Sequence, residues 1–167
     1  MSVLARAFTY AVLFIGLVLI YLPSRFLSWS GIVRPTTIEL PQVAGMVVGA
    51  AGGAVALWCI FLFALFGKGT PAPFDPPRRL VVQGPYHFVR NPMYISAGVA
   101  LAGAALFYKS LPLLGYAGIF LLATHFFVVL FEESTLRQTF GQEYENYCRR
   151  VRRWWPNIAT SHDSDAT

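Results

Sequence analysis

Charged side chains are scarce in this sequence: Asp, Glu, Lys and Arg make up 13% of its 167 residues, whereas 56% are hydrophobic. This composition excludes an ordinary soluble domain, in which about a quarter of the residues are charged. A helix that crosses the hydrocarbon core of a bilayer needs about 20 apolar residues. The scarcity of charge therefore predicts an all-α integral membrane protein, provided that apolar runs of that length are present.

Cysteine is scarce, and a signal-peptide cleavage site is absent. Cysteine occurs only as Cys59 and Cys148, which fall in different parts of the predicted geometry, so neither a disulfide nor a metal site is expected. A small-residue cleavage site is absent after the first apolar run, where Pro23 to Phe26 follow instead. We therefore expect the first run to stay in the protein as a membrane span.

Four apolar runs are present, at Val3 to Leu22, Val43 to Phe66, Met93 to Tyr108 and Leu111 to Phe131. The third is short, and the fourth contains His125 as its only ionisable residue. Together they predict about four transmembrane helices. The sequence further predicts one membrane domain over residues 1–156 and a disordered tail over 157–167.

The basic residues are distributed unevenly between the two sides of such a bundle. Lys and Arg accumulate on the cytoplasmic side, which predicts that both termini and the long central loop face the cytoplasm, at the cell membrane if the protein is bacterial. A basic rim beside anionic headgroups accounts for the net charge of +5 without a nucleic-acid partner. One side has Arg6, Lys68, Arg78, Arg79, Arg90, Arg137, Arg149, Arg150, Arg152 and Arg153, and the other has Arg25, Arg34 and Lys109.

Small residues form a strip on the second run, where Gly45, Gly49 and Gly53 recur at every fourth position. Such a strip lets another backbone approach closely. It predicts either tight packing within one bundle or a homodimer through these three glycines, and the sequence does not choose between them.

The polar residues are concentrated in two segments, 67–91 and 132–167. In the first, Gly84 and Pro85 fit a turn, and Pro92 fits the first turn of the third span. In the second, the pair Glu132 and Glu133 follows the last span, and apolar residues from 136 to 151 recur at spacings of three and four. That spacing predicts a C-terminal cytoplasmic amphipathic helix.

These segments contain the strings GPYHFVRNPMY and FGQEYENYCRRVRRWWP, with the EE pair between them. In this order they resemble the isoprenylcysteine carboxyl methyltransferase and phospholipid methyltransferase superfamily, over about residues 78–156. The resemblance implies a small helical membrane bundle that binds S-adenosylmethionine at its cytoplasmic mouth and methylates a lipid or small apolar substrate.

The resemblance also implies the roles of individual residues. Its RHPxY signature matches Arg90 to Tyr94, with Asn91 where histidine is usual, and its cofactor-binding glutamate matches Glu132. In carboxyl methyltransferases an arginine at the position of Val128 contacts the substrate, so the resemblance argues against a prenylcysteine carboxylate and leaves an amine, a thiol or another small apolar nucleophile as the acceptor. The implied cofactor-binding residues are Arg78, Arg79, Leu80, Val81, Tyr86, Asn91, Pro92, Met93, Tyr94 and Glu132.

The sequence offers no obvious general base for deprotonating an amine or a thiol. His125 is one hypothesis, because ionisable residues inside a membrane are often functional, and Tyr94 is the other catalytic candidate. Structural alternatives stay open. His125 could make a hydrogen bond between helices, the two glutamates could pair with Arg90 or Arg137, and the tyrosines could belong to an interfacial aromatic belt.

Two other functions remain consistent with the sequence. Sterol reductases of the same broad superfamily use a nicotinamide cofactor, but this chain lacks additional spans for a large sterol pocket. A non-catalytic membrane scaffold is the third possibility, although a scaffold does not require Tyr86, Asn91 and Glu132 together.

Overall fold

The computed structural model describes residues 9, 12–13, 15–32, 35, 37–67 and 78–156. Within them every regular element is a helix, and a single isolated bridge joins Val89 and Arg152. Nine of the 20 residues of the predicted first span, and all of the predicted tail, lie outside the described residues. In chain order the elements are η1 (Ile15–Tyr21), α2 (Leu22–Trp29), α3 (Leu40–Leu62), η2 (Phe63–Gly67), η3 (Gly84–His87), α4 (Pro92–Phe107), α5 (Leu111–Phe127), η4 (Val128–Glu132), α6 (Glu133–Phe140) and α7 (Gln142–Arg150).

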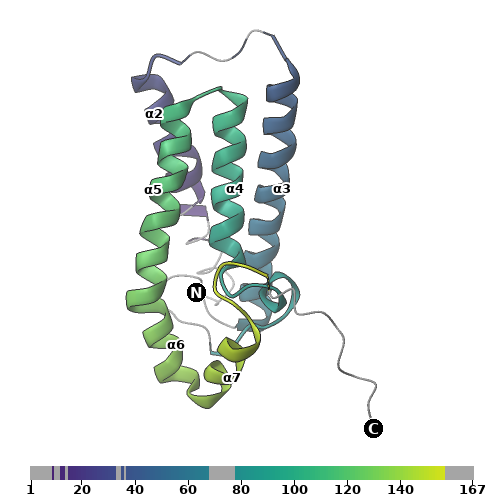
Figure 1. Ribbon diagram of the computed structural model, residues 1–167, viewed down its shortest axis with the longest axis vertical. Helices are drawn as coiled ribbons and strands as arrows, with labels where there is room; N and C mark the ends of the chain where they lie inside the picture. The colour runs from purple at the N-terminus through teal and green to yellow at the C-terminus, as the bar shows by residue number, and fades with distance from the viewer. Residues whose placement is uncertain are drawn as a thin grey trace.

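Two helical stretches in the described part of the chain are long and apolar enough to cross a membrane. Leu40–Gly67 joins α3 to η2 and reaches a mean hydropathy of 2.2, and Leu111–Phe140 joins α5, η4 and α6 and reaches 2.1. Helix α4 is apolar but has only 16 residues. In Figure 1, α4 stands between α3 and α5, with α2 beside α5.

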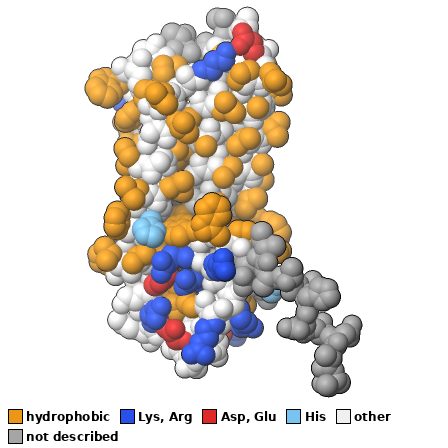
Figure 2. Space-filling model, viewed as in Figure 1, with side chains coloured by type: hydrophobic (Ala, Val, Ile, Leu, Met, Phe, Trp, Pro, Cys, Tyr) orange, Lys and Arg blue, Asp and Glu red, His pale blue; other side chains and the backbone are white. Residues whose placement is uncertain are grey.

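One end of the bundle is polar, and we call it the polar cap: residues 78–91 and 132–156. Figure 1 shows α6, α7 and residues 151–156, which we call the C-terminal segment, folded together at this end. The predicted amphipathic region forms two helices, because the chain reverses at Gly141, whose φ of 49° favours glycine. Figure 2 shows hydrophobic side chains along the bundle and Lys and Arg side chains gathered over the cap.

Local sequence determines where the long helices begin. Proline stands in the first turn of α3, α4 and α5, where its missing N–H has no intrahelical partner to lose. Ser110 caps α5 by accepting a hydrogen bond from the backbone N–H of Leu113 at 3.2 Å. The tight turn before it places Lys109 at φ 48°, where its ammonium pairs with Glu39 at 2.6 Å.

Helices α3 and α4 pack with their backbones nearly in contact. A Cβ added at Gly45 would lie 2.5 Å from the backbone nitrogen of Phe107, and one at Gly52 would lie 2.6 Å from that of Ala100. Gly49 also faces α4, whereas Gly53 has open space around it. The strip therefore supports packing inside one bundle, and a homodimer through Gly45, Gly49 and Gly53 stays a prediction.

We expect Gly103→Ala to destabilise the bundle. The new methyl group would overlap the backbone of Gly49, and overpacking of this kind typically costs about 1–3 kcal/mol. Gly118→Ala on α5 is the matched control, because a Cβ there meets nothing within 4 Å. Thermal unfolding in detergent should show a lower midpoint for Gly103→Ala alone, and equal midpoints for the two variants would contradict this account of the interface.

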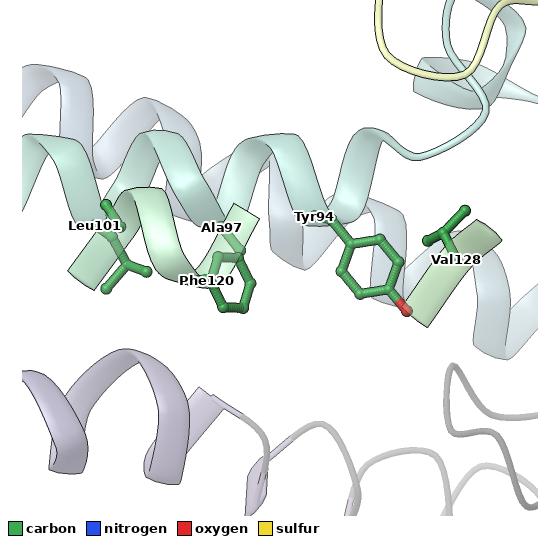
Figure 3. Close-up of a cluster of buried hydrophobic side chains, with 6 residues drawn as sticks. Tyr94, Ala97, Leu101, Phe120 and Val128 are labelled. Atoms are coloured by element: carbon green, nitrogen blue, oxygen red, sulfur yellow. The ribbon is translucent and has the colours of Figure 1, made fainter. Parts of the chain in front are cut away.

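The main apolar core lies between α4 and α5. It contains Tyr94, Ala97 and Leu101 of α4 and Ala117, Phe120 and Val128 from the α5 side. Figure 3 shows that the ring of Tyr94 extends from α4 with its hydroxyl on the side of Val128, away from Ala97, Phe120 and Leu101. This packing places Tyr94 at the boundary between the apolar core and the polar cap.

Candidate functional site

A cavity lies where the polar cap meets the helical bundle. Its empty volume is about 430 Å³, including the part open to solvent. Residues from both segments of the cap contribute to its walls, together with Phe63 and Val128 of the bundle. The lining consists of Phe63, Leu80, Val81, Tyr86, Arg90, Asn91, Val128, Glu132, Glu133, Leu136, Tyr144 and Tyr147.

Glu132 provides a half-buried carboxylate at this cavity. It ends η4, a π-helical turn between α5 and α6, and such turns occur frequently at functional sites. Its Oε2 accepts a hydrogen bond from the hydroxyl of Tyr94 at 3.0 Å. No Lys or Arg among the described residues forms an ion pair with Glu132. A cationic ligand that enters the cavity would therefore meet a carboxyl group that no described Lys or Arg neutralises.

The adjacent glutamate has a different environment. Glu133 is buried, and its two carboxylate oxygens accept hydrogen bonds from Nε and Nη2 of Arg153 at 2.6 and 2.9 Å. Nη1 of Arg90 lies 3.2 Å from the same carboxylate. Two arginines thus neutralise Glu133, which makes it a structural anchor for the C-terminal segment. Its predicted partner Arg137 instead pairs with Glu145.

Arg90 connects three parts of the polar cap. Besides Glu133, its Nη1 contacts Sγ of Cys148 at 2.7 Å and the hydroxyl of Tyr144 at 3.5 Å. Its backbone N–H donates to the carbonyl of Arg152 at 2.9 Å. Its Nε is buried and finds no hydrogen-bond partner in the described part of the protein. Because buried donors are normally paired, this atom is suited to an acceptor on a ligand.

Two tyrosines, Tyr86 and Tyr147, also line the cavity. The hydroxyl of Tyr147 donates to the backbone carbonyl of Tyr86 at 2.6 Å, and the ring of Tyr86 packs on Phe63 with 5.5 Å between centroids. Burial is the main cause that raises the pKa of both tyrosines above the ordinary value. Both hydroxyls therefore stay protonated at neutral pH, as the hydrogen bond from Tyr147 requires.

The structure brings together most of the residues that the sequence predicted for the site. Leu80, Val81, Tyr86, Asn91 and Glu132 line the cavity. Tyr94 reaches it through its hydrogen bond to Glu132. The amide of Asn91 donates to the carbonyl of Arg153 at 3.3 Å, so Asn91 also ties the C-terminal segment to the start of α4.

The other predicted residues lie outside the cavity lining. Arg78 and Arg79 are exposed, Met93 packs in the apolar core, and Pro92 starts α4. Nδ1 of His125 accepts a hydrogen bond from the indole N–H of Trp154 at 3.0 Å. The partner lies in the irregular segment after α7 and not on another helix, and the role of His125 as a general base stays a prediction.

Several lining residues were not predicted as site residues. Arg90 lies within the motif GPYHFVRNPMY. Leu136, Tyr144 and Tyr147 lie on the apolar stripe of the predicted amphipathic helix, so the sequence contained a signal for all four residues. The sequence contained no signal for Phe63, because nothing distinguishes it from the other phenylalanines of the same apolar run. Val128 was singled out only for its departure from the carboxyl methyltransferases, and it lines the cavity with 1% of its surface exposed.

The family model of phospholipid methyltransferases matches residues 40–143 of this chain. The matched range extends from the start of α3 to the start of α7 and includes Tyr86, Asn91, Tyr94 and Glu132. No curated protein and no solved structure gives a significant match. Because the family model covers more than half of the 167 residues, the chain belongs to the phospholipid methyltransferase family and is a membrane methyltransferase.

Proposed function

We propose that this protein transfers a methyl group from S-adenosylmethionine to a lipid or a small apolar acceptor at the membrane face where the polar cap lies. The observation that carries the proposal is Glu132, a carboxylate at the cavity with no cationic partner among the described residues. An ammonium group such as that of the methionine moiety would supply the missing positive charge.

A second feature of the cavity fits the same ligand. The methionine moiety of S-adenosylmethionine also has a carboxylate, which could accept a hydrogen bond from the unpaired Nε of Arg90. Tyr86 and Phe63 offer aromatic surface for the adenine. The cavity thus provides an anion, a cation and an apolar wall, which are the groups that a zwitterionic nucleoside requires.

The bound cofactor would supply an electrophilic methyl group on a positively charged sulfonium. The residues of this chain would act mainly by orientation, since correct alignment of two reactants can contribute about 7–11 kcal/mol to lowering the barrier. Glu132, held by Tyr94, would fix one end of the cofactor. Apolar side chains such as Val81 and Val128 would exclude water.

The acceptor is proposed to be an amine or a thiol. Val128 lines the cavity four residues before Glu132, so a carboxylate acceptor meets an isopropyl group at that position. The arginines of the polar cap and the few cations at the opposite end of the bundle support a cytoplasmic location for the cap. Both termini would then be cytoplasmic.

Calorimetric titration of the protein in lipid nanodiscs tests the proposal. S-adenosylhomocysteine has the same amino-acid end and should bind saturably, whereas the reduced nicotinamide cofactor should not. Binding of the nicotinamide cofactor alone would indicate a reductase instead. Binding of neither ligand to the folded protein would indicate a scaffold.

A further inference from the structure

A second hollow lies on the outer face of the bundle, between α3 and α4. Its empty volume is about 980 Å³, including the part open to the surroundings. We call it the outer groove. Its lining consists of Ala51, Gly52, Val55, Pro85, Phe88, Val89, Pro92, Ile95, Ser96, Val99, Trp154, Trp155 and Pro156.

The walls of the outer groove are almost entirely apolar. On the α3 side the lining includes the small residues Ala51 and Gly52. On the α4 side it includes Val99, which is 39% exposed. Ser96 contributes the single hydroxyl of the lining, and that hydroxyl already donates to the carbonyl of Met93 within α4 at 2.9 Å. The groove therefore suits a hydrocarbon chain that makes no hydrogen bonds.

The outer groove is separate from the cavity at Glu132. Pro85 and Pro92 line the groove, whereas Tyr86 and Asn91, their neighbours in the chain, line the cavity. No residue lines both. A ligand in the groove would contact the outer side of segment 85–92 without entering the methyl-transfer site.

The end of the groove nearest the cap is next to positive charge. Trp154 and Trp155 of the polar cap line the groove, and Figure 2 shows Lys and Arg side chains gathered over the cap. The side chain of Arg152 is exposed, and its backbone is bridged to Val89 of the groove wall. Residues 78–156 contain eight arginines and four glutamates, and arginines neutralise two of these glutamates, Glu133 and Glu145.

We propose that the outer groove binds one acyl chain of an anionic glycerophospholipid from the leaflet that faces the polar cap, with the lipid phosphate near Arg152. The apolar walls fit the chain, and the excess of arginine favours an anionic headgroup over a zwitterionic one. Tryptophan is enriched where membrane proteins meet lipid headgroups, and Trp154 and Trp155 line the groove. This lipid is a bound ligand of the fold and is distinct from the methyl acceptor.

Quenching of tryptophan fluorescence by brominated lipids tests the proposal on the full chain. Trp29→Phe and Trp58→Phe leave Trp154 and Trp155 as the only reporters. In phosphatidylcholine bilayers, phosphatidylglycerol with bromine on its acyl chain should reach half-maximal quenching at a several-fold lower mole fraction than brominated phosphatidylcholine. Equal quenching by the two lipids would overturn the proposal.

Two variants in that background locate the lipid. Val99→Phe should fill the groove and remove the strong quenching, whereas Leu106→Phe, on the same helix and 42% exposed outside the groove lining, should not. Arg152→Gln should remove the preference for phosphatidylglycerol, whereas Arg149→Gln on α7 should retain it. Arg152 is exposed, so its substitution tests the proposal even if Val99→Phe fails to fold. A preference retained in Arg152→Gln, or a concentration-dependent dimer that Val99→Phe disrupts, would overturn it.

Discussion

Replacing Glu132 with glutamine is expected to abolish binding of S-adenosylhomocysteine while the protein stays folded. Glutamine has nearly the same shape and can still accept the hydrogen bond from Tyr94, but it has no charge to pair with an ammonium group. Loss of one partner from a buried, hydrogen-bonded charge pair typically costs about 2–5 kcal/mol. That corresponds to binding at least about 30-fold weaker.

Calorimetric titration and thermal unfolding of the same sample separate binding from folding. The matched control is Glu143→Gln, an exposed glutamate on α7 outside the cavity lining, which should bind like the wild type. The unfolding midpoint of Glu132→Gln should also match the wild type, because no ion pair among the described residues depends on Glu132. Wild-type affinity in folded Glu132→Gln would remove Glu132 from the site.

The helices of the bundle were largely predictable from the sequence. The third apolar run, predicted at 93–108, forms α4 over Pro92–Phe107, and the fourth begins at Leu111 as predicted. Apolar composition gives the length of these helices, and the prolines at 92 and 112 mark their starts. The π-helical turn at Val128–Glu132 was not predictable, because its first four residues continue the apolar run of the helix before it.

The cavity was predictable only in part, because two segments form it by folding back on each other. A motif identified Tyr86, Asn91 and Glu132, and all three line the cavity. The pairing of Arg153 with Glu133 depends on the chain reversal at Gly141, which sequence spacing does not reveal. On a straight helix Arg137 would be the nearer partner of Glu133, being four residues away.

Replacing Glu133 with alanine is expected to destabilise the polar cap. The change removes the anion that pairs with Arg153 and with Arg90, whose side chain is only 12% exposed. Breaking a buried ion pair by removing one partner costs about 3–5 kcal/mol, because the remaining charge is left buried without compensation. The unpaired charge left behind would be least compensated at Arg90, since its Nε has no protein partner in the described residues even in the wild type.

Thermal unfolding of Glu133→Ala beside Glu145→Ala measures this effect. Glu145 also pairs with an arginine, Arg137, but both side chains are exposed, and exposed pairs contribute about 0–1 kcal/mol. Similar midpoints for the two variants would show that Glu133 does not anchor the cap. A marked drop for Glu133→Ala and none for Glu132→Gln would separate two adjacent glutamates: Glu133, whose charge holds the cap, and Glu132, whose charge stays available for a ligand.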